Sequence, residues 1–205
     1  FAEPTEYRQA FRDRSGGKFV YRWDRRGRFT HFHIYSYVPP GSGRAFETFR
    51  HSVLQHEATH CMLHALAGTR QIPLWFDEGL AELVECWDLR ALLRGEVDLR
   101  YSRWSQNQAL RNPGNGWYVH APDLSRLLRI TTWNVDRMGP RTRYQYAIAW
   151  NFMEFLFSTD RGRAKLRQML QRLSADEPLL QERETYELEQ HWHIYLRKCL
   201  KQIPH

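Results

Sequence analysis

The run Pro39-Pro40-Gly41-Ser42-Gly43 constrains the fold of this chain most, because neither a helix nor a strand continues through such a segment. Before it, residues 18–38 alternate between apolar and polar side chains on both sides of Arg25-Arg26-Gly27, which is typical of a β-hairpin. After it, apolar residues recur at helical spacing. The sequence therefore predicts an α+β fold, with a small N-terminal β-sheet or hairpin followed by a mainly helical part.

The helices expected after the break are separated by recognisable stop and start signals. Gly68 is a natural helix end, and Asp123 is a good N-cap for a short helix. We take residues 1–43 as the lead-in and hairpin of a single compact domain that residues 44–205 complete. The helices are expected over about residues 44–67, 74–93, 123–130, 143–158, 161–173 and 181–200, with an irregular excursion over 95–122.

The composition excludes several classes of protein. The 205 residues are 42% hydrophobic and 14% aromatic, which is enough for a sizeable core and argues against global disorder. No apolar run approaches the ~18 residues of a membrane-spanning helix, so no transmembrane segment is expected. The formal net charge is +7, but the arginines are spread along the chain and interleaved with acidic residues. We therefore expect a solvated basic surface and no nucleic-acid partner.

The cysteines do not settle the redox compartment of the protein. Cys61, Cys86 and Cys199 form no CxxC pair, their number is odd, and the first two lie in apolar helical patterns that predict buried thiols. The chain begins at Phe1, so its start says nothing about a targeting segment. We favour an exported or cell-envelope location slightly over a cytoplasmic one, and the oligomeric state is open.

The sequence His56-Glu57-Ala58-Thr59-His60 is an HExxH motif within the first predicted helix. Residues four apart stack on one helical face, so His56 and His60 can bind the same metal ion. Glu57 then lies beside the metal and its water, where a carboxylate can act as a general base. The alternative is a pair of hydrogen-bonded core histidines with a salt-bridged glutamate.

A third ligand is needed, and the spacing favours Glu78. A metzincin would carry Gly and His where this chain has Leu63 and Leu66. From His60 the helix runs about 12 Å to Gly68, and a second helix folding back would return about 9 Å to Glu78. Glu78 would then lie level with the two histidines.

Glu82 lies four residues after Glu78 and therefore on the same helical face. From there it could accept the free N–H of a ligand imidazole and so fix the orientation of the ring. The alternative is that both glutamates form a solvated acidic stripe. Trp75, Phe76 and Leu80 make the helix more apolar than that alternative would require.

The motif followed by Pro73-Leu74-Trp75-Phe76-Asp77-Glu78-Gly79-Leu80-Ala81-Glu82 resembles the gluzincin signature. It is most similar to the bacterial peptidase-MA-like family, HExxH…WFxEGLAE, and distantly similar to aminopeptidase N. The resemblance implies a zincin-type domain in which the HExxH helix carries the active site. It also implies that His56, His60 and Glu78 bind Zn²⁺ and that Glu57 is the general base.

The resemblance extends to Tyr144-Gln145-Tyr146-Ala147-Ile148-Ala149-Trp150, which is similar to a helix of aminopeptidase-N-like gluzincins whose tyrosine hydroxyl points at the zinc site. Aligning Phe155-Leu156 with the apolar end of that helix favours Tyr146 over Tyr144. A phenolic O–H at this place would stabilise the oxyanion of the reaction. The GxMxN strand of the aminopeptidases has no counterpart between Phe29 and Gly43, which favours an endopeptidase.

The expected function is therefore zinc-dependent hydrolysis of a peptide or protein substrate. One alternative is a non-catalytic or latent gluzincin-fold module that binds a peptide or partner. Another, a DNA-associated HExxH protease, is disfavoured because such proteins use a third histidine. The strand Phe29–Val38 could pair with an extended peptide, and its His31 and His33 are expected to be exposed or to line a pocket. Other aromatic residues could line the cleft or pack in the core: Trp75, Trp104, Trp117, Tyr35 and Tyr37.

Overall fold

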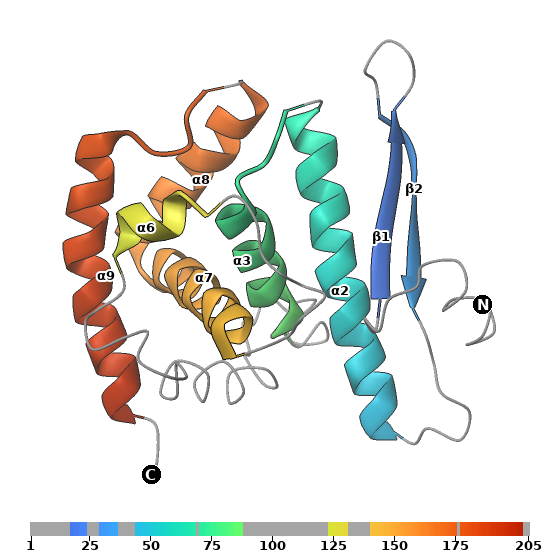
Figure 1. The fold of residues 1–205 in the computed structure, drawn as a ribbon, viewed down its shortest axis with the longest axis horizontal. Coiled ribbons are helices and arrows are strands. Elements are labelled where there is room, and N and C mark those ends of the chain that lie inside the picture. The colour runs from blue at the N-terminus through green and yellow to red at the C-terminus, as the bar shows by residue number, and fades with distance from the viewer. Residues whose placement is uncertain are drawn as a thin grey trace.

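The computed structural model describes residues 17–23, 29–36, 44–68, 70–87, 123–130, 140–175 and 177–202. Within these ranges the chain is mainly helical, as the sequence predicts, with one small antiparallel sheet (Figure 1). The irregular excursion expected over residues 95–122 lies outside the described residues. So do three of the aromatic residues considered for the cleft, namely Tyr37, Trp104 and Trp117.

The predicted hairpin is confirmed. Strands β1 (Gly17–Trp23) and β2 (Phe29–Ser36) pair antiparallel, from Gly17 opposite Ser36 to Trp23 opposite Phe29, with an irregularity at Arg22 and Trp23. Both strands pack against helix α2 (Arg44–Ala67), which stands between the hairpin and the other helices (Figure 1).

The remaining helices are α3 (Leu74–Glu85), α6 (Leu124–Leu128), α7 (Pro140–Ser158), α8 (Asp160–Ser174) and α9 (Glu182–Gln202). Their ends follow local chemistry. Gly68 ends α2 in the left-handed region at φ 64°, where glycine has no steric penalty. The Asp123 carboxylate accepts the Arg126 backbone N–H and caps α6, as predicted. The Thr159 hydroxyl caps α8 in the same way at Gly162.

Two helix boundaries differ from the prediction by three residues or more. α3 ends at Glu85 rather than near Leu93, because the backbone N–H groups of Cys86 and Trp87 bond three residues back, to Leu83 and Val84. This tightens the last turn and stops the helix. α7 begins at Pro140, three residues earlier than expected. Proline is favoured at the first helical position, where its missing N–H costs nothing.

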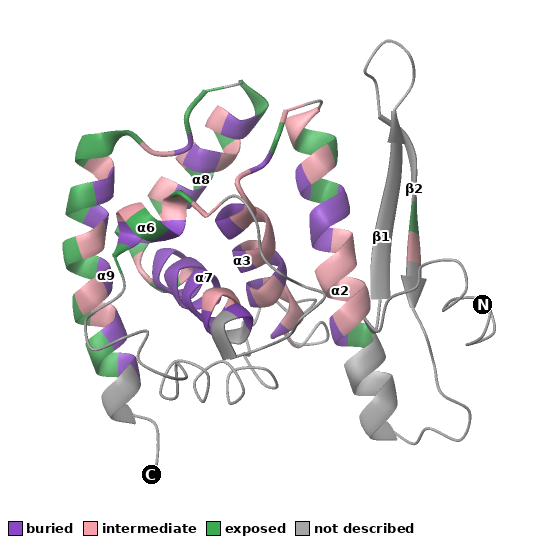
Figure 2. Ribbon diagram, viewed as in Figure 1, coloured by how far each residue is buried: buried purple, intermediate pink, exposed green. Residues whose placement is uncertain are grey.

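Helix α7 forms the centre of the hydrophobic core and is buried along most of its length (Figure 2). It packs against α3 and α8 and touches α9, where the buried Trp192 indole N–H donates to the Asn151 side chain at 2.9 Å. The approach to α3 is close at Gly79, because a Cβ there would lie 2.8 Å from the Ala149 carbonyl oxygen. Glycine thus lets α7 pack directly against the helix that carries Glu78. The largest fully buried apolar side chains are Trp150, Trp192, Phe76, Phe152, Leu83, Leu124, Met153, Leu156, Met169 and Leu173.

Of the helices that the structure describes, none combines the length and apolarity that crossing a membrane would require.

Candidate metal centre

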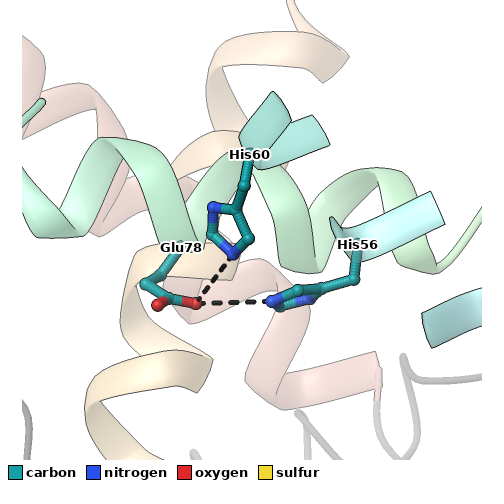
Figure 3. A group of neighbouring side chains, drawn as sticks. All are labelled: His56, His60 and Glu78. Carbon is teal, nitrogen blue, oxygen red and sulfur yellow. Dashed lines mark ion pairs between the residues drawn. The ribbon is translucent and has the colours of Figure 1, made fainter. Parts of the chain in front are cut away.

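Helices α2 and α3 bring His56, His60 and Glu78 together (Figure 3). One carboxylate oxygen of Glu78, Oε2, lies 3.4 Å from Nε2 of His56 and 3.6 Å from Nε2 of His60. The two rings are 4.8 Å apart and nearly perpendicular. The chain reverses between Gly68 and Pro73, so α3 runs back along α2. These three residues therefore converge, as expected from helix geometry.

The donor set fits a metal ion. Glu78 Oε2 is buried and has no hydrogen-bond partner among the described residues, which is costly for a carboxylate oxygen. Ligand atoms at about 2.1 Å from a tetrahedral ion lie about 3.4 Å from one another. The two Glu78–histidine distances agree with that spacing. Two imidazole nitrogens and a carboxylate oxygen are ligands that Zn²⁺ takes in catalytic sites.

The other nitrogen of each imidazole contacts a carboxylate. His56 Nδ1 lies 3.0 Å from Glu85 Oε2, and His60 Nδ1 lies 2.7 Å from Asp77 Oδ1. Because a carboxylate only accepts, each Nδ1 donates its proton to its carboxylate, which leaves Nε2 of the neutral ring as the nitrogen that can bind a metal ion. Both rings are therefore held in the tautomer that a metal ion requires.

Sequence reasoning missed Asp77 and Glu85. Glu85 had a signal, because it lies seven residues after Glu78 and therefore on the same helical face. Glu82, the expected partner of a ligand imidazole, has a carboxylate oxygen in a group with His56 and Glu85 whose ligand atoms all lie within 4.8 Å of one another. The contact of His56 Nδ1 described above goes to Glu85, and the role assigned to Glu82 stays a prediction.

The electrostatics of the centre follow from these contacts. Burial lowers the pKa of His56, but the neighbouring carboxylates of Glu78, Glu85 and Glu82 outweigh burial, and the pKa lies well above its ordinary value. Burial likewise works against the charged form of Asp77, yet hydrogen bonds from His60 and His64 hold its pKa at about 2. The site is therefore rich in negative charge, which favours a cation.

Tyr146 lies within the electric field of the same carboxylates, whereas Tyr144 is packed in the core with 4% of its surface exposed. Burial raises the pKa of Tyr146, and the charges of Glu78, Glu82 and Glu57 raise it further. Residues two apart lie on different faces of a helix, so only one of the two tyrosines can face the site. Tyr146 is coupled electrostatically to these carboxylates, and its preference over Tyr144 stays a prediction. Glu57 itself is half-buried on α2.

Other residues considered at the sequence level are also placed. His33 is exposed on β2, in agreement with the expectation for that strand. Cys61 and Cys86 are buried thiols, as predicted, and Cys199 is also a buried thiol. His64, also on α2, has Nε2 3.4 Å from Oδ2 of Asp77.

Comparison of the chain with protein-family models, curated proteins and solved structures finds no match. The function of the site has to be inferred from its own chemistry.

Proposed function

We propose that this protein is a zinc-dependent peptide hydrolase of the gluzincin type, with a zincin-type fold around helix α2. One observation carries the proposal: Glu78 Oε2 is buried, has no hydrogen-bond partner among the described residues, and lies 3.4 and 3.6 Å from the Nε2 atoms of His56 and His60. These three residues would hold the metal ion. Carboxylates on both Nδ1 atoms support the proposal because they keep the rings in the metal-binding tautomer.

When bound in such a site, Zn²⁺ supplies Lewis acidity and lowers the pKa of a water molecule to about 7. Glu57, next to His56 in the chain, takes a proton from the attacking water and passes it to the leaving nitrogen. Tyr146 donates its O–H to the carbonyl oxygen as negative charge develops there. A phenol has a pKa of about 10 and is protonated at neutral pH, so Tyr146 can act as a donor.

An endopeptidase is favoured over an exopeptidase, because the strand that would hold a substrate amino terminus in aminopeptidases has no counterpart in the sequence. Strand β2 offers a way to bind an extended peptide. It pairs with β1 along one edge, and within the described ranges no strand pairs with its other edge. Since β1 and β2 both pack on α2, such a peptide would lie on the hairpin side of the helix that carries His56 and His60.

The proposal is tested by measuring bound zinc and peptide cleavage for the purified wild type, Glu57→Gln and Glu78→Gln. We expect about one zinc per chain in the wild type, and cleavage within at least one peptide of a mixed-sequence library. Glu57→Gln should keep zinc and lose cleavage, and Glu78→Gln should lose both. Glu187→Gln, on the exposed side of α9, is the matched control and should keep both.

The outcomes separate the alternatives. A wild type that takes up no zinc would overturn the metal site itself. A wild type that holds zinc but cleaves no peptide of the library would instead identify a binding module. Cleavage that persists in Glu57→Gln would remove Glu57 from the mechanism.

A further inference from the structure

A third histidine, His64, is connected to the candidate metal centre without reaching the ligand atoms. It lies one turn after His60 on α2, and its Nε2 is 3.4 Å from Oδ2 of Asp77. The other oxygen of that carboxylate, Oδ1, is 2.7 Å from Nδ1 of His60. Asp77 is thus held between two imidazoles from successive turns of the same helix.

This arrangement matters because a carboxylate that contacts one donor can still rotate about its side-chain bonds. A second donor on the other oxygen fixes the plane of the carboxylate. Since Asp77 in turn fixes the ring of His60, the orientation of Nε2 toward Glu78 depends on both contacts. All three side chains are largely buried, with 11% of His60, 14% of Asp77 and 18% of His64 exposed, so water competes little for these contacts.

The carboxylate that contacts His56 comes from another part of α3. Glu85 contacts His56 Nδ1 at 3.0 Å and comes from the last turn of α3, whereas Asp77 comes from the first turn. The two carboxylates therefore reach the centre from opposite ends of α3. A change at His64 should therefore affect the contact between Asp77 and His60 and leave the contact between Glu85 and His56 unchanged.

We propose that His64 is a positioning residue of the metal centre, which acts on the ligand His60 through Asp77. The inference rests on the proposed function, in that the centre has to bind a metal ion. It adds a residue outside the HExxH and WFxEGLAE motifs to the machinery of the site. His64 itself neither binds the metal ion nor transfers a proton.

The test is the dissociation constant for Zn²⁺, measured by competition with a chromophoric chelator on the full chain. Asp77→Asn should weaken zinc binding by about 10- to 100-fold, as for the loss of other carboxylate partners of ligand histidines. His64→Asn should weaken it by about 3- to 10-fold, because the shorter amide does not reach Oδ2. His64→Gln, long enough to donate an N–H there, should bind nearly as well as the wild type. His51→Asn, an exposed histidine on the same helix, should have no effect.

A double-mutant cycle separates positioning from a general effect on the fold. The variant with both His64→Asn and Asp77→Asn should bind zinc no more weakly than Asp77→Asn alone. The effects of His64→Asn and Glu85→Gln should instead multiply, because they act on different rings. Melting temperatures of the zinc-free proteins show whether each variant is folded. The Co²⁺ absorption spectrum reports directly on the ligand geometry in His64→Asn, and it should return to the wild-type form in His64→Gln.

The inference is overturned if His64→Asn binds zinc as tightly as the wild type, or if its effect multiplies with that of Asp77→Asn. In both cases a wild type that binds zinc leaves the proposed function standing. If the wild type itself binds no zinc, the proposed function and this inference fail together. An equal loss in His64→Asn and His64→Gln, without rescue, would also contradict positioning through Asp77.

Discussion

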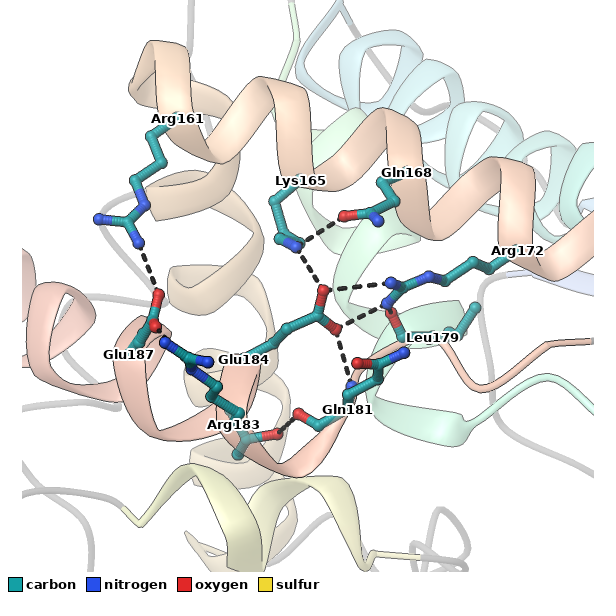
Figure 4. A network of polar contacts seen from close by, with 10 residues as sticks. Arg161, Lys165, Gln168, Arg172, Leu179, Gln181, Arg183, Glu184 and Glu187 are labelled. Carbon is teal, nitrogen blue, oxygen red and sulfur yellow. Dashed lines mark hydrogen bonds and ion pairs between the residues drawn. The ribbon is translucent and has the colours of Figure 1, made fainter.

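Glu184, in the first turn of α9, has a hydrogen-bond environment that gives a quantitative prediction about stability (Figure 4). Its carboxylate accepts from Lys165 Nζ at 2.7 Å and from Arg172 Nη1 and Nη2 at 2.7 and 3.1 Å. It also accepts from the Gln181 backbone N–H at 2.8 Å. These contacts join the end of the loop before α9 to α8. We therefore expect the Glu184→Gln substitution to destabilise the packing of α9 on α8.

The size of the effect follows from the pKa. The hydrogen bond from Arg172 lowers the pKa of Glu184 most, burial opposes this, and Lys165 adds to the lowering, so the pKa falls from 4.5 to about 2. Such a shift corresponds to at most about 3 kcal/mol at neutral pH. Because 19% of the side chain is exposed, screening by solvent reduces our expectation to about 1–2 kcal/mol.

The sign of the pH dependence is fixed. A depressed carboxyl pKa stabilises the folded protein above the unfolded pKa of 4.5, and this contribution is lost as the pH falls toward about 2. The stability difference between wild type and Glu184→Gln should therefore be full at pH 7. It should fall to less than half of that value by about pH 3.

Urea unfolding at pH 7, 5, 4 and 3, followed by circular dichroism, measures this difference. Glu187→Gln is the matched control, because Glu187 lies on the same helix and pairs with Arg161 at 2.8 Å, but 45% of its side chain is exposed. An exposed pair contributes about 0–1 kcal/mol, so this variant should change the free energy of unfolding much less. Equal losses in the two variants, or a Glu184→Gln loss that does not depend on pH, would show that the ionised Glu184 carboxylate does not stabilise the fold in this way.

Three further predictions concern the site. Gly79→Ala places a Cβ 2.8 Å from the Ala149 carbonyl oxygen. Overpacking should cost about 1–3 kcal/mol, and the higher helix propensity of alanine should offset about 1 kcal/mol of that cost. We therefore expect a lower melting temperature and an unchanged zinc affinity. Zinc at 100 times its dissociation constant should stabilise the protein by about 2.7 kcal/mol, which corresponds to a rise of roughly 5–11 °C in melting temperature. This rise should vanish when a chelator is added and in the Glu78→Gln variant. Tyr146→Phe should lower kcat on a cleaved peptide about 10- to 100-fold, whereas Tyr144→Phe should affect melting more than kcat; the reverse order would reassign the oxyanion donor.

The fold was predictable where local signals decide it. The hairpin follows from alternation around Arg25-Arg26-Gly27, and the end of α2 follows from Gly68. The end of α3 was not predictable from apolar spacing, which continues past Cys86 in the sequence. The helix stops where the backbone N–H groups of Cys86 and Trp87 bond to carbonyls three residues back. Periodicity describes which face of a helix is apolar, and it contains little information about the residue at which the helix stops.

The metal-ligand group was predictable for a different reason. His56 and His60 share a helical face, and a reversed second helix returns Glu78 to their level, which are rigid consequences of helix geometry. The partners of the imidazole Nδ1 atoms were not predictable in this way. Whether Glu82 or Glu85 contacts His56 depends on how α3 is rotated about its axis against α2, and spacing alone leaves both on the same face.

The charge of the site could not have been inferred from composition. The chain carries a formal net charge of +7, yet the sides of α2 and α3 that face each other bring Asp77, Glu78 and Glu85 against two imidazoles. At short range and in a partly buried setting, nearby carboxylates outweigh charges farther away, whose field is screened over about 8 Å at physiological salt. The centre should therefore attract a divalent cation although the net charge of the chain is positive. It follows that raising the salt concentration, which weakens long-range repulsion by the arginines, should not weaken zinc binding much.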